Sequence, residues 1–403
     1  MNDQQEDPKP QETAIVPKKA PVSSQVIAAE SVQAEEVPTI PLDSLHTLNT
    51  LQPEVSVRAL AKTQVGTVPE PLVVQPAEYR RGPGEWMRIW WDGIRPYYLW
   101  FAVLPLALGS VLAWLASISP KQPLGDFHIQ RFAVALVAVC LLQIGANLLN
   151  DYYDYVGGVD TSNSLGPGGL IQQGLIKPAR VLTLGLFALI VGAFSGALMA
   201  FYGGMPAFIF GGLGLLGAYF YSAPPRALSR LTLGEVVSFW LFGPLLTLGA
   251  YSIQRGKMDS LPLVCSISLG LLISATLYVN DMRDTESDAQ ARKYTLASLL
   301  SMRANRFVAT LLFVGAYVPM IVLGIPAHGP HLLLITLWTL PGMVSILIAL
   351  YRTTTPASLH ITMHQALKMT IFFTILLIVA ITITTYQTWL PHFGLYNPFN
   401  WII

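Results

Sequence analysis

One stretch sets the fold class of this chain: residues 132–160, which read FAVALVAVCLLQIGANLLNDYYDYVGGVD. The part from 132 to 149 carries no Asp, Glu, Lys or Arg, and three aspartates follow in the rest of the stretch. A charge-free run of about 20 residues is what an α-helix needs to cross the hydrocarbon core of a bilayer. The stretch therefore predicts a membrane-spanning helix whose end carries an acidic face.

The same apolar pattern recurs along the rest of the chain. Nine stretches without Asp, Glu, Lys or Arg follow residue 97, namely 98–118, 132–149, 181–202, 205–222, 236–252, 263–279, 307–324, 332–350 and 369–390. With 53% hydrophobic and 12% charged residues, the composition excludes an ordinary soluble enzyme and a disordered protein. Both cysteines, Cys140 and Cys265, lie in apolar runs, which argues against a disulfide scaffold. We expect an all-α integral membrane fold in which nine transmembrane helices within residues 97–403 enclose an intramembrane cavity.

The N-terminal part has a different composition. Residues 1–79 hold 11 acidic and 5 basic residues, ten prolines and no periodic apolar stripe, so we expect a disordered tail. Residues 80–96 combine Trp86, Trp90 and Trp91 with several arginines. That mixture is typical of a short amphipathic segment lying in the membrane interface.

The distribution of basic residues predicts the orientation in the membrane. If the N-terminus is cytoplasmic, 15 Lys and Arg after residue 79 fall on the inner side and 4 on the outer side. The positive-inside rule therefore predicts a multi-pass protein of the cytoplasmic membrane with its C-terminus outside. The lipid bilayer is its expected surrounding, and no nucleic-acid partner is expected.

The acidic residues of the membrane part are concentrated in two windows. The first holds Asp151, Asp154 and Asp160, shortly after Asn147, and the second holds Asp281, Asp284, Glu286 and Asp288. Within each window, side chains spaced i, i+3 or i+4, and i+7 share one face of a helix. Each window follows an even-numbered helix of the nine. We therefore expect the two acidic faces to lie on the same, cytoplasmic side and to converge.

Two acidic faces at one membrane surface suit a cation that binds oxygen. Mg²⁺ usually binds through one or two carboxylates together with substrate phosphates. The pattern therefore predicts Mg²⁺ sites that hold a diphosphate, with the lipid part of the substrate among the helices. Acids at helix ends are also common as solvated caps. A cation-coupled transporter uses similar carboxylates, although nearer the bilayer midplane.

These residues resemble the UbiA superfamily of intramembrane prenyltransferases, over about residues 86–390. Residues 147–160 match the first Asp-rich motif of its 1,4-dihydroxy-2-naphthoate polyprenyltransferase branch, and residues 280–288 match the second. Many relatives carry a basic residue in the loop that here spans 166–174, where this chain has none. The string Tyr-Ser-Ala-Pro-Pro at 221–225 is also similar to the chlorophyll-synthase branch.

The resemblance implies a nine-helix prenyltransferase domain and Mg²⁺-dependent transfer of a polyprenyl group from polyprenyl diphosphate to an aromatic acceptor. The acceptor it favours is 1,4-dihydroxy-2-naphthoate, with loss of carbon dioxide, in menaquinone biosynthesis. A chlorin, another quinone precursor or a haem stays open as the acceptor. The cation-coupled transporter stays open as well.

The resemblance also implies roles for individual residues. The metal ligands it implies are Asp151, Asp154, Asp160, Asp281, Asp284 and Asp288. The diphosphate-binding residues are Asn147, Arg226, Arg230, Arg283 and Lys293, and the catalytic residues are Asp154, Asp284, Asn280 and Tyr221. The basic residues are equally explained by the positive-inside pattern, and Tyr221 and Tyr153 by packing. His360 and His364, spaced i and i+4, are interpreted as structural because no third metal ligand is evident.

Overall fold

The structure, a computed structural model, describes residues 82–158, 169–225, 227–290, 293–326, 329–352 and 355–389. The expected tail at 1–79 lies outside the described residues, and so do Asp160 and Arg226. The described part is helical and contains no β-ladder beyond one isolated bridge between Ser119 and Gln122. The all-α fold class is therefore confirmed.

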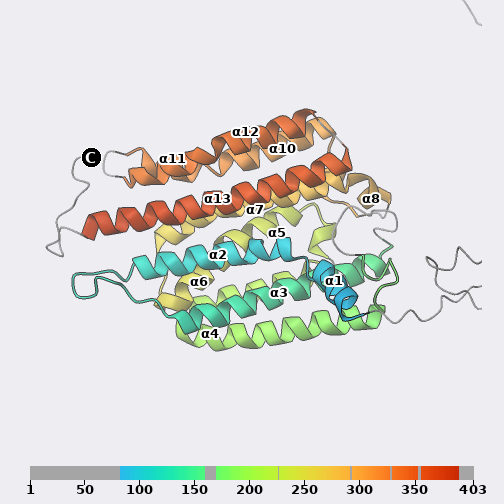
Figure 1. Cartoon of the computed structure of the whole chain (residues 1–403), viewed down its shortest axis with the longest axis horizontal. Coiled ribbons are helices and arrows are strands. Elements are labelled where there is room, and N and C mark those ends of the chain that lie inside the picture. Colours follow the sequence, from blue (N-terminus) through green and yellow to red (C-terminus); the bar gives the residue numbers. More distant parts are fainter. Residues whose placement is uncertain are drawn as a thin grey trace, which may run out of the picture. The chain divides into compact units, whose positions relative to one another are not determined.

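The described part of the chain forms thirteen α-helices. They are α1 (Pro83–Ile94), α2 (Pro96–Leu115), α3 (Ile129–Val156), α4 (Pro178–Phe220), α5 (Gly234–Trp240), α6 (Leu246–Arg255), α7 (Ser260–Arg283), α8 (Thr285–Gln290), α9 (Leu296–Leu299), α10 (Met302–Gly315), α11 (Val318–Gly324), α12 (Leu340–Arg352) and α13 (Pro356–Trp389). Shorter 3₁₀ or π turns are η2 (Leu228–Arg230), η3 (Leu241–Leu245) and η4 (His331–Thr339). The long helices lie side by side along one common direction (Figure 1).

Eight helical stretches of the described residues are long and apolar enough to cross a membrane. They are Pro96–Leu115, Ile129–Val156, Pro178–Phe220, Gly234–Arg255, Ser260–Arg283, Met302–Gly324, His331–Arg352 and Pro356–Thr388. Helix α4 exposes a row of large apolar side chains, Phe187, Ile190 and Phe194, at helical spacing. A row of this kind belongs against lipid, because water does not favour so wide an apolar face.

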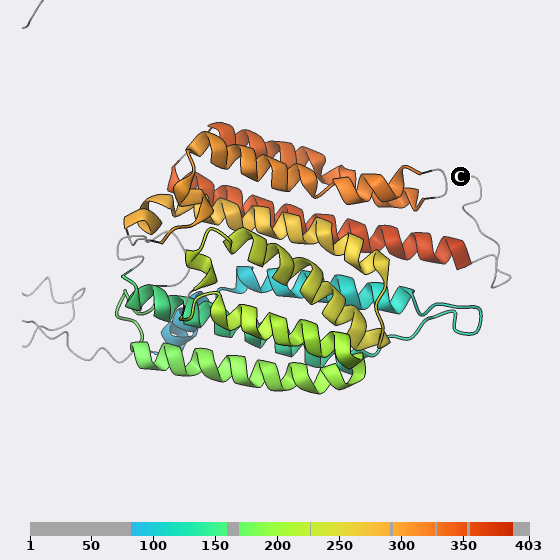
Figure 2. The ribbon, with the colours of Figure 1, turned by 180° about the vertical axis from the view of Figure 1, so that it is seen from behind.

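The long helix α4 explains why nine expected spans become eight stretches. Its 43 residues would form a straight helix about 65 Å long, roughly twice the hydrocarbon thickness. At Gly204, however, φ is 66° and ψ is −161°, a conformation that glycine adopts readily. Leu189 and Ala223 lie in one apolar cluster, which requires the second half of α4 to run back along the first (Figure 2). The described part therefore holds both expected helices, 181–202 and 205–222, within one element.

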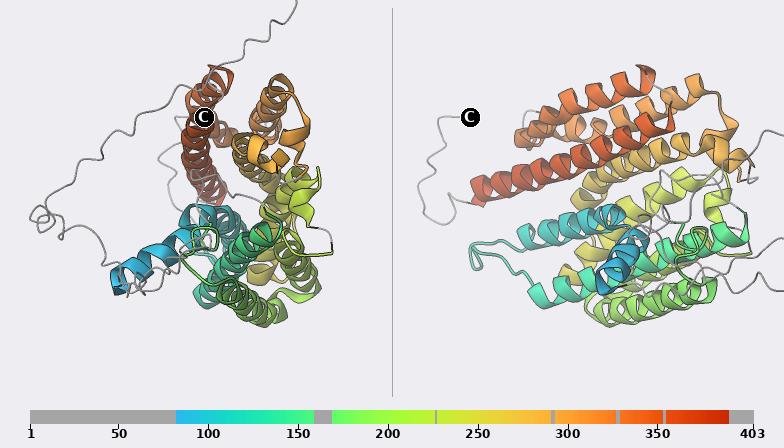
Figure 3. Two further views of the ribbon diagram at one scale, coloured as in Figure 1. Left: turned by 90° about the vertical axis from the view of Figure 1, so that its right-hand side faces the viewer. Right: turned by 45° about the vertical axis from the view of Figure 1, so that its right-hand side comes forward.

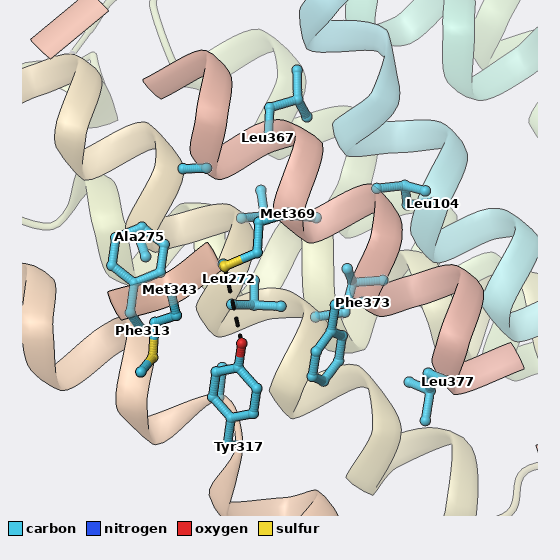
Figure 4. Packing of buried hydrophobic residues seen from close by; sticks show 14 of the residues in the cluster. Leu104, Leu272, Ala275, Phe313, Tyr317, Met343, Leu367, Met369, Phe373 and Leu377 are labelled. Atoms are coloured by element: carbon cyan, nitrogen blue, oxygen red, sulfur yellow. Dashed lines mark hydrogen bonds between the residues drawn. The ribbon is translucent and has the colours of Figure 1, made fainter. Parts of the chain in front are cut away.

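The main apolar core surrounds α7 and fixes the helix that carries the second acidic window. Tyr278 of α7, Phe313 of α10 and Phe373 of α13 are completely buried in it. The hydroxyl of Tyr317 bonds to Thr339 at 2.6 Å and also reaches the sulfur of Met369 (Figure 4). Because such interiors are close-packed, the end of α7 has little freedom to move.

The two acidic windows lie at one end of the helix bundle. The C-terminal end of α3 carries the first window, and the end of α7 together with α8 carries the second. Figure 1 shows these ends, with α1, on the same side of the bundle, and Figure 3 shows α1 running across the long helices. The expected helix in 80–96 is present as α1, while its position in the membrane interface stays a prediction.

We expect Gly109→Ala to lower the free energy of unfolding by about 1–3 kcal/mol. Helices α2 and α6 approach closely at Gly109, where an added Cβ would lie 2.1 Å from the carbonyl oxygen of Thr247. Either the helices separate or the backbone shifts. Thermal unfolding in detergent measures the effect. Gly84→Ala is the control, because nothing lies within 4 Å of a Cβ there. Equal melting temperatures for the two variants would contradict this close contact.

Candidate active site

The first acidic window occupies the last turns of α3. Asn147, Asp151 and Asp154 are all buried there, on one face, as their spacing predicted. The side-chain amide of Asn147 donates to the carbonyl oxygen of Ile94 at 2.9 Å and accepts from Gln143 at 3.2 Å. These bonds tie the end of α1 to the acidic face of α3, so Asn147 helps to assemble the site.

Arg95, at the junction of α1 and α2, supplies a positive charge to this face. Its Nη2 donates to Asp151 Oδ1 in a largely buried ion pair. Burial alone would lower the pKa of the Arg95 guanidinium, but its interactions with Asp151, Tyr98 and Asp154 together outweigh that effect and raise the pKa. Arg95 was not among the predicted site residues. Its position directly before Pro96 was the one signal available.

Asp154 is also held by two side chains from different elements. Asn150 Nδ2 donates to Asp154 Oδ2, and Arg230 Nη2 lies 3.7 Å from Asp154 Oδ1. Arg230, which ends η2, also donates to the carbonyl oxygen of Tyr153 at 3.0 Å. The structure therefore brings Arg230, one of the predicted diphosphate-binding residues, to the first window.

The second window begins at the end of α7. The hydroxyl of Tyr98 donates to Asn280 Oδ1 at 2.8 Å, and Asn280 Nδ2 donates to Asp284 Oδ2 at 3.4 Å. Arg283 holds Asp284 with two hydrogen bonds of 2.7 Å each, and its Nη1 lies 3.0 Å from His360 Nδ1. Arg283 is therefore occupied by Asp284 and His360.

The two histidines of α13 take part in this contact. The Nε2 atoms of His360 and His364 lie 3.2 Å apart, and the ring of Tyr97 packs edge-on against His364. The pair extends the hydrogen-bonded chain that starts at Asp284 and passes through Arg283. Within the described residues, no three His, Cys, Asp or Glu side chains lie close enough together to hold a metal ion by themselves.

Lys293 links the two windows electrostatically. Its Nζ lies 3.3 Å from Asp288 Oδ1. Burial alone would lower the pKa of the Lys293 ammonium, but the carboxylates of Asp154, Asp288 and Asp281 raise it. Asp154 belongs to the first window and the other two to the second, so the windows converge around this ammonium group.

Asp288, one of the predicted metal ligands, is engaged by Lys293. Its side chain is only 1% exposed. Burial raises the pKa of the Asp288 carboxyl to about 7, and the nearby Lys293 ammonium opposes that rise. Asp288 is thus paired with Lys293, and its role as a metal ligand stays a prediction.

A cavity of about 980 Å³ lies between the two windows. Its polar lining is Arg95, Tyr98, Gln143, Asn147, Asn150, Tyr221, Asn280 and Asp281. A second, apolar cavity of about 970 Å³ extends among α2, α3, α4 and α6. Val139, Leu142, Gly214, Leu241 and Leu246 line both cavities, so the two spaces meet. A polar end next to an apolar extension suits a long molecule with a charged head.

The residues around this cavity fit a divalent cation with a diphosphate. Carboxylate and amide oxygens are the ligands that Mg²⁺ prefers, and one or two carboxylates suffice when phosphates complete the shell. Both carboxylate oxygens of Glu235 are buried without an N–H or hydroxyl donor from another residue in the described part of the chain, and its carboxyl lies within hydrogen-bonding range of the Asp281 carboxyl. Sequence analysis did not select Glu235, Tyr98 or Asn150 for the site.

Comparison with known proteins identifies relatives of this chain. The UbiA prenyltransferase family matches this chain over residues 102–374. A Haemophilus influenzae protein named 1,4-dihydroxy-2-naphthoate octaprenyltransferase is 34% identical over 229 residues, covering 55% of this chain and 72% of that protein. A Bacillus subtilis protein of the same name is 26% identical over 300 residues, covering 74% of this chain and 94% of that protein.

Solved structures show the same fold. A UbiA homolog from Archaeoglobus fulgidus bound to GPP and Mg²⁺ has a TM-score of 0.54 at 14% identity, covering 73% of this chain and 99% of that one. The apo structure of a UbiA homolog from Aeropyrum pernix K1 has a TM-score of 0.52 at 14% identity, covering 70% of this chain and 97% of that one. With the family match extending over well more than half of its length, this chain belongs to the UbiA prenyltransferase family and is a multi-pass membrane prenyltransferase.

Proposed function

We propose that this protein transfers a polyprenyl group from polyprenyl diphosphate to 1,4-dihydroxy-2-naphthoate in a Mg²⁺-dependent reaction of menaquinone biosynthesis. The observation that carries the proposal is the meeting of both acidic windows at one cavity that continues into an apolar one. The relatives named for this acceptor support it, as does the Archaeoglobus fulgidus homolog bound to GPP and Mg²⁺. Family membership sets aside the transporter that the acidic residues alone left open.

The oxygen ligands in this proposal come from both windows. Asn147 lines the cavity from α3, on the same face as Asp151 and Asp154, and Asp281 lines it from the end of α7, three residues before Asp284. Asp160 lies outside the described residues, and its role as a ligand remains a prediction. Mg²⁺ bound by these groups supplies positive charge that stabilises the departing diphosphate.

The positive side chains have separate tasks. Arg230 lies beside Asp154 and Lys293 beside Asp288, where diphosphate oxygens can replace these carboxylates as the partners. Arg283 positions Asp284, because its guanidinium is already occupied by Asp284 and His360. Arg226 remains a predicted diphosphate contact outside the described residues.

The proposed reaction joins the allylic carbon of the donor to a ring carbon of the acceptor. The bond between the allylic carbon and the diphosphate oxygen breaks, and the electron pair leaves with the diphosphate. The ring carbon that bears the carboxylate of the acceptor attacks the allylic carbon, and that carboxylate then leaves as carbon dioxide. Tyr221 and Tyr98 line the cavity, where an aromatic face stabilises positive charge on the allylic group. Asn280, held by Tyr98, orders this wall and contributes to catalysis.

The proposed location is the cytoplasmic membrane, with the N-terminus in the cytoplasm and the C-terminus outside. The support is the distribution of 15 basic residues on one side against 4 on the other. In this orientation the end of the bundle that carries both acidic windows faces the cytoplasm. Charged diphosphate and the naphthoate then reach the cavity without crossing the bilayer.

Membranes carrying the full chain provide the test of this function. We expect a prenylated, decarboxylated product from 1,4-dihydroxy-2-naphthoate and a polyprenyl diphosphate, detected by mass spectrometry of the lipid extract. Removing Mg²⁺ with EDTA should abolish the product, and adding excess Mg²⁺ should restore it. A panel containing a chlorin, another quinone precursor and a haem tests the acceptor. A product with one of these acceptors and none with the naphthoate would overturn the proposed substrate.

A further inference from the structure

Glu235 is a buried carboxylate without a visible counter-charge. It is the second residue of α5 and is only 8% exposed. Its carboxylate oxygens receive no hydrogen bond from an N–H or hydroxyl group of another residue in the described part of the chain, and its carboxyl lies within hydrogen-bonding range of the Asp281 carboxyl. None of the five ion pairs found among the described residues includes it. An uncompensated buried carboxylate is strongly unfavourable, so such a group is either protonated or paired with a cation.

The packing of α5 against α7 directs Glu235 toward the second acidic window. Ser274 Oγ of α7 donates to the backbone carbonyl of Glu235 at 3.1 Å. Eight residues further along the chain from Glu235, Gly243 packs so closely on Gly270 that an added Cβ would lie 2.8 Å from the Cα of Gly270. The two segments are therefore antiparallel. The residue seven positions after Ser274, on the same face of α7, is Asp281.

The direction of the Glu235 side chain agrees with this antiparallel packing against α7. Side chains on a helix tilt toward its N-terminus, which for Glu235 means toward the end of α7. Glu235 interacts electrostatically with Asp281, Tyr221 and Tyr278. Asp281 and Tyr221 both line the cavity between the acidic windows. Glu235 thus stands beside the cavity wall, next to the first carboxylate of the second window.

The positively charged side chains near Glu235 already interact with other carboxylates. Lys293 interacts with Asp154, Asp288 and Asp281, and Arg283 is bound to Asp284. The buried Glu235 and the half-buried Asp281 therefore form no ion pair with a Lys or Arg among the described residues. A divalent cation is the partner that such a pair accepts, because Mg²⁺ takes oxygen ligands from one or two carboxylates.

We propose that Glu235 is a further ligand of the metal and diphosphate site, where it pairs with Asp281 from the opposite helix. The inference rests on the proposed function, since it concerns the cation that accompanies the diphosphate. Glu235 extends the site to α5, a third element beside α3 and α7. The alternative for the same two groups is a proton shared between the carboxyls, which needs no metal.

Binding of Mn²⁺ to the full chain in nanodiscs tests the proposal directly. Mn²⁺ replaces Mg²⁺ as the probe, inorganic diphosphate is present, and electron paramagnetic resonance measures free Mn²⁺. We expect Glu235→Gln to weaken Mn²⁺ binding about tenfold or more. The control is Asp92→Asn, which removes an exposed carboxylate of α1 and should leave Mn²⁺ binding unchanged. Wild-type affinity in folded Glu235→Gln would overturn the proposal in favour of the shared proton.

A second variant and a stability measurement distinguish the loss of a metal ligand from misfolding. Glu235→Asp keeps the charge but withdraws the carboxylate by one methylene, so it should weaken Mn²⁺ binding less than the amide does. Without metal, Glu235→Gln should be at least as stable as the wild type, because the amide removes an uncompensated charge. Mg²⁺ should raise the melting temperature of Glu235→Gln less than that of the wild type. An equal Mg²⁺-dependent rise in both proteins would overturn the role of Glu235.

The outcomes separate this inference from the proposed function. If the wild type forms the prenylated product and Glu235→Gln binds Mn²⁺ normally, only the role of Glu235 falls. If the wild type forms no product with any acceptor of the panel, the proposed function falls, whatever the Mn²⁺ measurement gives.

Discussion

Replacing Asp154 or Asp284 by Ala is expected to reduce prenyl transfer about a thousandfold or more, because each removes charge that organises the departing diphosphate. Asp154 is buried on the cavity face of α3, between Asn150 and Arg230. Asp284 is fixed at the end of α7 by two bonds from Arg283. Product formation at saturating Mg²⁺ measures both losses.

A double variant tests whether the two windows act on one diphosphate. If they do, Asp154→Ala combined with Asp284→Ala should be little worse than either single variant, since residues acting as a unit are not additive. Asp92→Asn serves as the control, with full activity expected from this exposed position on α1. Near wild-type turnover in either single variant, with the protein folded, would remove that residue from the mechanism.

The second large effect concerns stability and Arg95. Arg95→Met should lower the free energy of unfolding by about 3–5 kcal/mol, because it leaves the Asp151 carboxylate buried without its partner. The pair is largely buried and joins the start of α2 to α3. Thermal unfolding in nanodiscs, followed by intrinsic fluorescence, measures the loss.

The matched control for Arg95 removes both charges. Arg95→Met with Asp151→Asn should recover most of the stability, since no uncompensated charge remains, while prenyl transfer stays low. If Arg95→Met alone unfolds at the wild-type temperature, the ion pair does not hold the site together. If the double variant is as active as the wild type, Arg95 and Asp151 have no role in the reaction.

Local patterns in the sequence predicted much of the site. Asn147, Asp151 and Asp154 share a face of α3, and that follows from their spacing alone. The apolar stretches likewise predicted the membrane helices. The reversal inside α4 lies at Gly203 and Gly204, between two such stretches. The expected tail at 1–79 lies outside the described residues, so it stays a prediction.

Contacts made only through packing could not be predicted from these patterns. No Lys or Arg lies between Asn147 and Asp160 in the sequence. The structure instead brings Arg95 from the start of α2 and Arg230 from η2 to this face. Nothing in a local motif shows that such distant positions meet.

The second window shows the same limit. Arg283 and Lys293 were both predicted to bind diphosphate, because positive charges lie near the acids in the sequence. In the structure Arg283 is taken up by Asp284 and His360, whereas Lys293 interacts with both windows. Glu235 sits on a separate helix, so its relation to Asp281 depends on how α5 packs against α7.

The most direct measurement is anomalous X-ray diffraction from crystals of the full chain grown with Mn²⁺ and geranyl thiodiphosphate, a donor that resists cleavage. The account predicts Mn²⁺ density within about 2.5 Å of carboxylate oxygens from both α3 and the end of α7, with the diphosphate bridging them. Mn²⁺ bound by one window alone, with the diphosphate outside the cavity, would contradict it.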